Sequence, residues 1–183
     1  MATERLESLP AIETALWREL ADAPHDLQHP WRTAVLATTD GEFADARTVV
    51  LRESDVAEKR LTLFSDARTG KVTQLTTHPV GTLVLWSPTL NWQLRLRVHL
   101  QAETEGLAVS SSWAHLKLSP AAYDYLSALA PGSVLANAIG ARGERSHFAV
   151  ITAEVLSVDW LELHPQGHRR ARFAGGDAIW LQA

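Results

Sequence analysis

Three stretches of the chain concentrate side chains that could bind a phosphate. Arg47 and Arg52 lie close together in the first, Ser65 to Lys71 forms the second, and Gln93 begins a third that holds two more arginines. The second stretch, Ser-Asp-Ala-Arg-Thr-Gly-Lys, leads into a predicted helix, whose first N–H groups and partial positive charge attract an anion. A phosphate monoester would fit these groups.

Local spacing alone favours plainer interpretations of the same residues. Ser65 or Thr69 would then only cap the helix while the neighbouring cations stay solvated. Gln93 and the arginines after it would only form the wet face of a half-buried strand. A further argument is needed to choose between these interpretations and a phosphate site.

Other groupings are weaker candidates for chemistry. His25 and His29, and likewise His164 and His168, are spaced like metal ligands on a helix, but each pair lies beside a proline and lacks a third ligand. We therefore predict no metal site. Residues 110–112, a run of three serines, are interpreted as helix-capping residues because no histidine and aspartate pair with them.

Composition narrows the class of protein. The chain has 183 residues, of which 46% are apolar and 21% charged, as expected for a single globular domain over 1–183. Seventeen Lys and Arg against 21 Asp and Glu give a formal charge of −4, the wrong sign for a chain that coats nucleic acid or anionic membrane. The absence of cysteine excludes disulfides, thiolate metal sites and cysteine nucleophiles.

The pattern of apolar residues predicts neither a membrane span nor a secretion signal. No apolar run approaches the roughly 18 residues that a span needs, and Glu4, Arg5 and Glu7 occupy the start of the chain. We expect a cytoplasmic protein without a membrane or nucleic-acid partner.

Hydrophobic periodicity predicts a mainly β protein. A helix is expected over 8–22, where apolar residues recur at helical spacing behind Ser8. The clearest strand is 92–101, in which apolar residues alternate with Gln, Arg and His. Asp40-Gly41 between two apolar runs predicts a hairpin. Further strands are expected over 32–39, 44–51, 61–65, 82–86, 148–163, around 172–173 and 179–181, and further helices over 69–77, 113–118 and 121–129. This order favours an antiparallel β-barrel with attached helices, its core spanning about 31–181.

Taken in order, several motifs resemble a known family. Residues 47–52 read Arg-Thr-Val-Val-Leu-Arg, residues 63–66 read Leu-Phe-Ser-Asp, and Lys71, Leu85-Trp86 and Gln93 follow. Their order and spacing resemble the pyridoxamine 5′-phosphate oxidase-like FMN-binding split-barrel family from about Trp31 to Phe173. The resemblance implies a split antiparallel β-barrel with peripheral helices and a homodimer with FMN at the subunit interface.

The resemblance also assigns roles to individual residues. Arg47 and Lys71 would bind the FMN phosphate, with Ser65 as a neutral donor, and Gln93 would hydrogen-bond the flavin ring. Ser133 and Arg172 would come from the partner subunit. Arg95 and Arg97 would lie at or near the subunit contact. The predicted FMN site comprises Arg47, Thr48, Val49, Val50, Leu51, Arg52, Phe64, Ser65, Lys71, Gln93, Ser133 and Arg172.

The chain departs from the family pattern at two flavin contacts and on the substrate side. Gly132 stands where the family has Gln, and Leu161 stands where it has Trp, with Trp160 one residue away. The residues that hold the substrate phosphate in the family correspond to His115, Ser119 and Tyr123, a set that lacks the family's Arg. Losing a charge-assisted contact costs about 1.5–3 kcal/mol of binding. Pyridoxine phosphate is therefore a poor candidate substrate.

The function implied is an FMN-dependent oxidoreductase acting on a small organic molecule. No catalytic residue is assigned, because the flavin itself carries the electron chemistry. A flavin-binding or flavin-sensing module without turnover is the alternative. Two other uses of a barrel stay open: binding single-stranded nucleic acid along Trp92, Arg95 and Arg97, and binding haem through His99 or His115.

Overall fold

The computed structural model describes residues 5–138, 140, 142–143 and 147–183. Within these residues the chain forms eight strands, three α-helices and two short 3₁₀ helices. The strands are β1 (Thr33–Thr39), β2 (Ala44–Asp55), β3 (Arg60–Asp66), β4 (Val80–Ser87), β5 (Trp92–Glu103), β6 (Phe148–Glu162), β7 (Arg169–Ala174) and β8 (Asp177–Leu181). The helices are α1 (Leu9–Asp22), α2 (Gly70–Thr77) and α3 (Leu107–Leu116), with 3₁₀ segments η1 (Pro30–Arg32) and η2 (Pro120–Tyr125).

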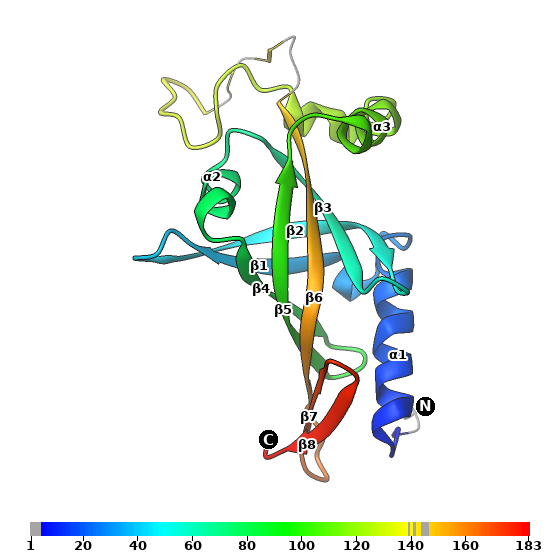
Figure 1. Ribbon diagram of the computed structural model, residues 1–183. Helices are drawn as coiled ribbons and strands as arrows, with labels where there is room; N and C mark the ends of the chain where they lie inside the picture. The colour runs from blue at the N-terminus through cyan, green and yellow to red at the C-terminus, as the bar shows by residue number, and fades with distance from the viewer. Residues whose placement is uncertain (1–4, 139, 141, 144–146) are drawn as a thin grey trace.

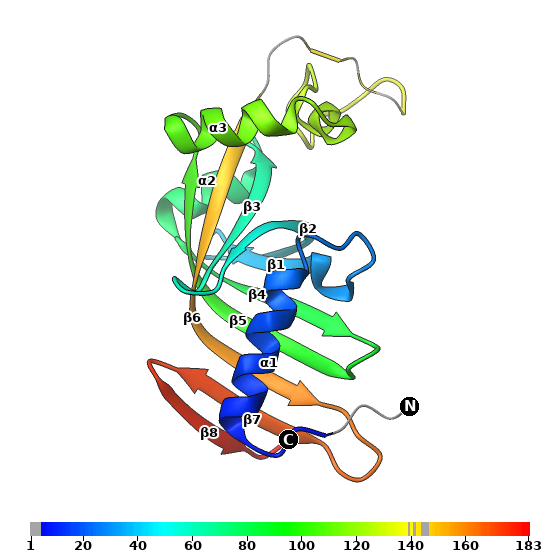
Figure 2. The same cartoon turned by 90° about the vertical axis from the view of Figure 1, so that its right-hand side faces the viewer.

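The strands form one antiparallel sheet that closes on itself. Their order is β3-β2-β1-β4-β5-β6-β7-β8, and β3 also pairs with β6, so the first six strands in this order make a barrel. One edge of β6 is shared: residues 148–154 pair with β3, whereas residues 157–162 pair with β7. The β7–β8 hairpin therefore extends from the barrel at the end away from α3 (Figures 1 and 2). The predicted split antiparallel β-barrel with peripheral helices is confirmed.

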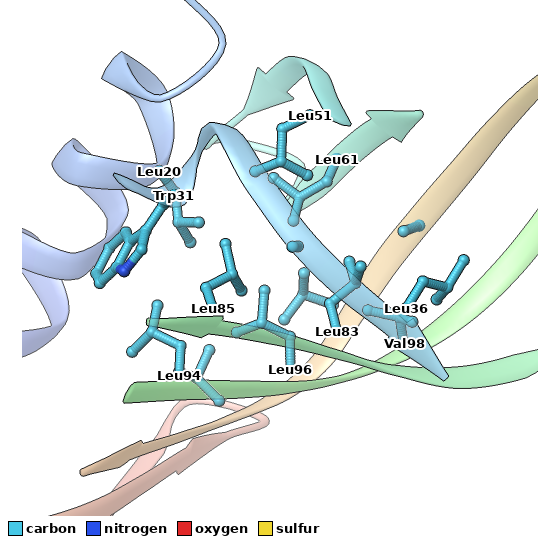
Figure 3. Packing of buried hydrophobic residues seen from close by; sticks show 14 of the residues in the cluster. Leu20, Trp31, Leu36, Leu51, Leu61, Leu83, Leu85, Leu94, Leu96 and Val98 are labelled. Carbon is cyan, nitrogen blue, oxygen red and sulfur yellow. The ribbon is translucent and has the colours of Figure 1, made fainter. Parts of the chain in front are cut away.

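The long strand β5 shows why the sheet curls around a core. Leu94, Leu96, Val98 and Leu100 are buried, while Arg95, Arg97 and His99 are exposed, as the alternation predicted. Inward side chains from the other strands meet them (Figure 3). Helix α1 begins at the predicted Ser8 cap and packs Leu16 and Leu20 on the same core. The barrel interior is therefore filled by side chains at this end.

A second, smaller cluster lies under α3. Val109 and Leu116 of α3 and Tyr125 of η2 bury Phe148 and Val150 of β6, and Phe64 packs against this group. The helices here differ from the prediction. The helix expected over 113–118 spans Leu107–Leu116, and that expected over 121–129 is the shorter η2.

The capping role expected for the serines at 110–112 is wrong. They lie inside α3, and the Ser110 hydroxyl donates to the carbonyl of Gly106, which is the actual N-cap. Serine bonded to the preceding turn is tolerated within a helix, so a run of serines did not fix where this helix begins.

None of the described helices is both long and apolar enough to cross a membrane.

A buried carboxylate ties the start of the chain to the β6–β7 hairpin. Glu162 accepts hydrogen bonds from Arg169 at 2.8 and 2.9 Å and from Arg5 at 2.7 Å. Burial by itself raises the pKa of the Glu162 carboxyl, but the bonds from the two arginines outweigh it and hold the pKa below its ordinary value. The carboxylate therefore stays ionised in the folded chain.

Glu162→Gln is expected to lower the free energy of unfolding by about 1 to 3 kcal/mol at neutral pH. A depressed carboxyl pKa adds stability that is present above the ordinary carboxyl pKa and is lost as pH falls through the folded-state pKa. The difference from wild type should thus shrink between about pH 7 and about pH 3, measured by urea unfolding. Glu154→Gln, on the exposed face of the same strand, is the control and should change little at any pH.

Candidate functional site

Two cations converge where α2 covers one end of the barrel. Lys71, in the first turn of α2, donates from Nζ to Ser65 Oγ at 2.8 Å and to Thr69 Oγ1 at 3.4 Å. Arg47 follows the inward register of β2 and donates to the Leu36 carbonyl at 3.2 Å and to the Thr38 hydroxyl at 2.6 Å. Residues from β2, β3 and α2 are thus brought together.

The electrostatics of this cluster fit an anion. Burial lowers the pKa of the Lys71 ammonium, and Arg47 lowers it further by repulsion, against a weaker opposing effect of Asp66. Asp66 is held by Arg68, which donates to both of its carboxylate oxygens. The Asp45 carboxylate lies 3.8 Å from Arg47, but its side chain is 56% exposed. A phosphate between Arg47 and Lys71 would relieve their repulsion.

The start of α2 supplies donors in the same place. Thr69 is the N-cap residue, but its side chain makes no capping bond and instead donates to the Asp66 carbonyl. No acceptor for the backbone N–H of Gly70 or Lys71 lies among the residues that the structure describes. The plain capping interpretation is therefore wrong for Thr69, and these N–H groups are free for a ligand.

A second group of predicted flavin contacts lies on the outer face of the sheet. Thr48 and Val50 are on the outward register of β2, and Gln93 and Arg172 are on the outward registers of β5 and β7. One row of paired residues crosses the sheet from Thr48 through β1 and β4 to Arg95, Asp159 and Arg172. By contrast, Val49 and Leu51 are core residues, so only their backbone could face a flavin.

The same outer face is rich in arginine. A cavity of about 430 Å³ is lined by Arg95, Arg97, Arg170 and Arg172. Asp159 pairs with Arg95 and Arg170, and no carboxylate within the described residues lies within 4 Å of the other two guanidinium groups. Burial alone would raise the pKa of the Asp159 carboxyl, but hydrogen bonds from Arg170 and Arg95 hold it below its usual value. The face therefore carries excess positive charge.

Arg52 and Phe64 lie in a third place, under α3. The Arg52 guanidinium is stacked 5.6 Å from the centre of the Phe64 ring. Both residues line a cavity of about 420 Å³, together with His115 and Ser119. Tyr123 does not line it; its ring lies 4.1 Å from the Arg142 guanidinium instead. Two of the three residues expected on the substrate side therefore meet here.

The departures from the family pattern have physical explanations. Gly132 has φ of 89°, in the left-handed region that glycine tolerates and Gln does not favour. Trp160 is completely buried and packs on Trp92, with ring centres 5.4 Å apart, so it does not replace the missing outward tryptophan. Leu161, its neighbour, pairs with Gln93 on the outer face. Ser133 lies exposed between η2 and β6, apart from the other predicted site residues of its own chain.

Sequence reasoning missed two polar residues that position Arg47. The Thr38 hydroxyl is only 3% exposed, accepts from Arg47 and donates to Gln74 of α2. Gln74 in turn donates to Asp45 beside Arg47. The one available signal was a threonine on the inward register of a strand. Threonine is too common in strands for this position to predict a contact with Arg47.

Three of the four paired histidines have structural partners for their side chains. His29 accepts from the Trp31 N–H and contacts Glu19, and His164 and His168 each accept a backbone N–H in the β6–β7 turn. Across the described part of the chain, no three His, Asp or Glu side chains gather as metal ligands would.

Comparison with known sequences identifies the family. Residues 13–103 match the family model described as pyridoxamine 5′-phosphate oxidase, FMN-binding domain. Over this span the chain is related to the pyridoxamine 5′-phosphate oxidase family. It is also 34% identical over 97 residues to a pyridoxine/pyridoxamine 5′-phosphate oxidase of Chromohalobacter salexigens. That match covers 51% of this chain and 44% of the relative, so the chain spans less than half the length of the curated relative it matches.

Solved structures share the whole fold. A pyridoxamine 5′-phosphate oxidase-related, FMN-binding protein of Nostoc punctiforme aligns with a TM-score of 0.70 at 18% identity, covering 100% of this chain and 99% of that one. PhzG of Burkholderia lata, in complex with tetrahydrophenazine-1-carboxylic acid, aligns at 0.71 and 16% identity, covering 97% and 94%. A heme-binding protein of Mycobacterium smegmatis aligns at 0.52 and 19% identity, covering 85% and 57%. At these identities the likeness concerns the fold alone.

Lys71→Met tests whether the Lys71 ammonium serves an anion. The variant loses two hydrogen bonds, one of them long, but also a desolvated, repelled charge, so its unfolding free energy should stay within about 1 kcal/mol of wild type. Inorganic phosphate should raise the melting temperature of the wild type and leave that of the variant unchanged. Arg18→Met, at a side chain 70% exposed on α1, should respond to phosphate like wild type. Equal protection of all three proteins would contradict the assignment.

Proposed function

We propose that this protein binds FMN and uses it to oxidise or reduce a small organic molecule. The observation that supports this most is the Arg47–Lys71 pair with the hydroxyls and free N–H groups around it. A dianionic phosphate needs several fixed cations and donors, and this cluster supplies both. The family described above adds the identity of the phosphate compound, because its model is that of an FMN-binding domain.

Each proposed contact follows from where the fold holds the residue. Ser65 and Thr69 hydroxyls and the start of α2 would complete the phosphate site around the two cations. Thr48, Val50 and Gln93, on the outer face, would line and hydrogen-bond the ring system, with Val49 and Leu51 contributing backbone only. Bound there, FMN would supply hydride and electron transfer, while the chain orients and shields it.

We further propose that the FMN site is shared by two copies of the chain. Gln93 and Arg172 lie on an outer face that includes the half-exposed Val35 and Trp86. An exposed sheet face that mixes apolar side chains with arginine is suited to cover by a second subunit. The partner would contribute Arg172 and Ser133. A cytoplasmic homodimer is the resulting expectation.

The substrate is proposed to differ from pyridoxine phosphate. Where the family places a phosphate-binding Arg, this chain has no arginine, and only His115 and Ser119 of the corresponding residues reach the cavity. PhzG shows that a protein of this fold is found with a tricyclic carboxylic acid, which makes a non-phosphorylated organic substrate reasonable here.

Haem binding is the second candidate, since a heme-binding protein shares the fold. His99 is exposed on the outer face of β5, and His115 is exposed and donates from Nδ1 to the Ser111 carbonyl. His115 lines the cavity of about 420 Å³ together with Arg52 and Ser119, so its surroundings there are partly polar. The absorption spectrum of the purified protein separates the two: flavin bands support the proposal, and a Soret band would replace it.

Arg47→Ala and Lys71→Ala should each weaken FMN binding about tenfold or more, because each removes a charge-assisted contact. Affinity is measured by quenching of flavin fluorescence on titration. Arg60→Ala, at a half-exposed cation on β3 outside the cluster, is the control and should bind like wild type. Unchanged affinity in both site variants would show that the phosphate binds elsewhere.

Mixing two variants tests whether the site spans two chains. Lys71→Ala and Arg172→Ala should each bind FMN weakly when alone. If Arg172 acts on the partner's FMN, a mixed dimer holds one site with both defects and one intact site. Dimers purified with two different affinity tags should therefore regain wild-type affinity at half of their sites. No recovery in mixed dimers would place Arg172 in the same site as Lys71 of its own chain, and wild-type FMN binding by Arg172→Ala alone would place it in neither site.

A further inference from the structure

The cavity under α3 combines apolar walls with a cation, and it is separate from the Arg47–Lys71 cluster. It occupies about 420 Å³ between α3 and strands β2 and β3, where α3 crosses the end of the barrel (Figure 2). Leu51, Phe64 and Leu116 give it apolar walls, and Arg52 lies on one side. None of its lining residues belongs to the Arg47–Lys71 cluster.

Arg52 is a cation without a counter-charge. No carboxylate in the described part of the chain lies within 4 Å of it, and its Nε is buried without an acceptor. Burial raises the pKa of the nearby Tyr125 hydroxyl, an effect that Arg52 only opposes, so Tyr125 stays neutral and does not balance the charge. A half-buried, uncompensated guanidinium is costly unless an anion pairs with it.

The opposite wall limits how much negative charge the cavity accepts. His115 donates from Nδ1 to the Ser111 carbonyl, so in its neutral form Nε2 carries only a lone pair. Ser119 donates its hydroxyl hydrogen to the Leu116 carbonyl. The carbonyl end of α3 adds a partial negative charge there, and Glu53, next to Arg52 on β2, adds a full one to the cavity. Arg32 and Arg52 against Glu53 leave one net positive charge, which suits a singly charged anion better than a phosphate dianion.

The remaining arginine of the cavity is already engaged. Arg32, the last residue of η1, donates to the Pro24 carbonyl at 2.6 Å. This bond holds the Arg32 side chain at the edge of the cavity. Arg52 is therefore the group with donors to spare. The guanidinium carbon of Arg52 also lies 5.6 Å over the Phe64 ring, and a guanidinium can bind both oxygens of a carboxylate at once.

We propose that this cavity binds the carboxylate of a small apolar organic acid, and that Arg52 is the residue that recognises it. The inference rests on the proposed function in that such an acid would be the substrate of the flavin-containing site. Arg52 follows directly on residues 48–51, which are proposed to line the flavin, so an acid held there would lie beside them.

Calorimetric titration with three probes tests this on both the FMN-loaded and the flavin-free protein. Benzoate should bind at least about tenfold more tightly than benzamide, which has the same shape without charge, because a charge-assisted pair is gained. Benzoate should also bind more tightly than the dianionic phenyl phosphate. Arg52→Gln should remove the preference for benzoate over benzamide, and Arg52→Lys should restore part of it.

A matched variant separates recognition from folding. Glu53→Gln removes the neighbouring negative charge and should strengthen benzoate binding while leaving benzamide unchanged. Equal affinity for benzoate and benzamide, tighter binding of phenyl phosphate, or an unchanged preference in Arg52→Gln would each overturn the proposal. Benzoate binding by protein that fails to take up FMN would refute the proposed function but not the carboxylate site. FMN binding without benzoate binding would refute only the carboxylate site.

Discussion

Pairing of β3 with the first half of β6 closes the barrel, and the candidate site depends on that closure. The closure fixes the end of β3, so that Ser65 lies beside Thr69 and Lys71 at the start of α2. Arg47 reaches the same cluster from β2. Without this pairing, β3 would be a free edge held only by β2, and the segment that leads from Ser65 into α2 would be fixed on one side only. The second half of β6 is then left to pair with β7, which carries Arg172 onto the outer face.

Charge is distributed unevenly over this scaffold. The chain as a whole is acidic, yet its described residues gather positive charge in three separate places: Arg47 with Lys71, the four arginines that line a cavity with Asp159, and Arg52 under α3. A cation that lacks a nearby anion is unfavourable when it is partly buried, so each group is more stable when an anion is present. In contrast, Glu162 between Arg5 and Arg169 is fully compensated, and its role is to fasten the start of the chain to the hairpin.

The three cationic groups lie on different surfaces of the molecule. The Arg47–Lys71 cluster is on the inward register at the barrel end, the arginine-rich cavity is on the outer face, and Arg52 is under α3. A phosphate, a shared interface and a substrate acid are thus proposed for surfaces that need not compete with one another. This separation allows one fold to keep its cofactor site while the substrate side changes, as the residues at 115, 119 and 123 illustrate.

The sequence by itself determined the features that depend on local periodicity and on order along the chain. The helix behind Ser8, the alternation of β5 and the order of the motifs from Arg47 to Gln93 were all predictable, because periodicity and spacing can be read directly from the sequence. It did not determine the start of α3, where a run of serines suits a cap and a helix interior equally. Only the tertiary structure decided that Val49 and Leu51 are core while Thr48 and Val50 face outward, that Thr38 and Gln74 support Arg47, and that no carboxylate in the described part of the chain pairs with Arg52. These properties depend on which residues from distant segments meet, and that is fixed by strand register and barrel closure rather than by neighbours in the chain.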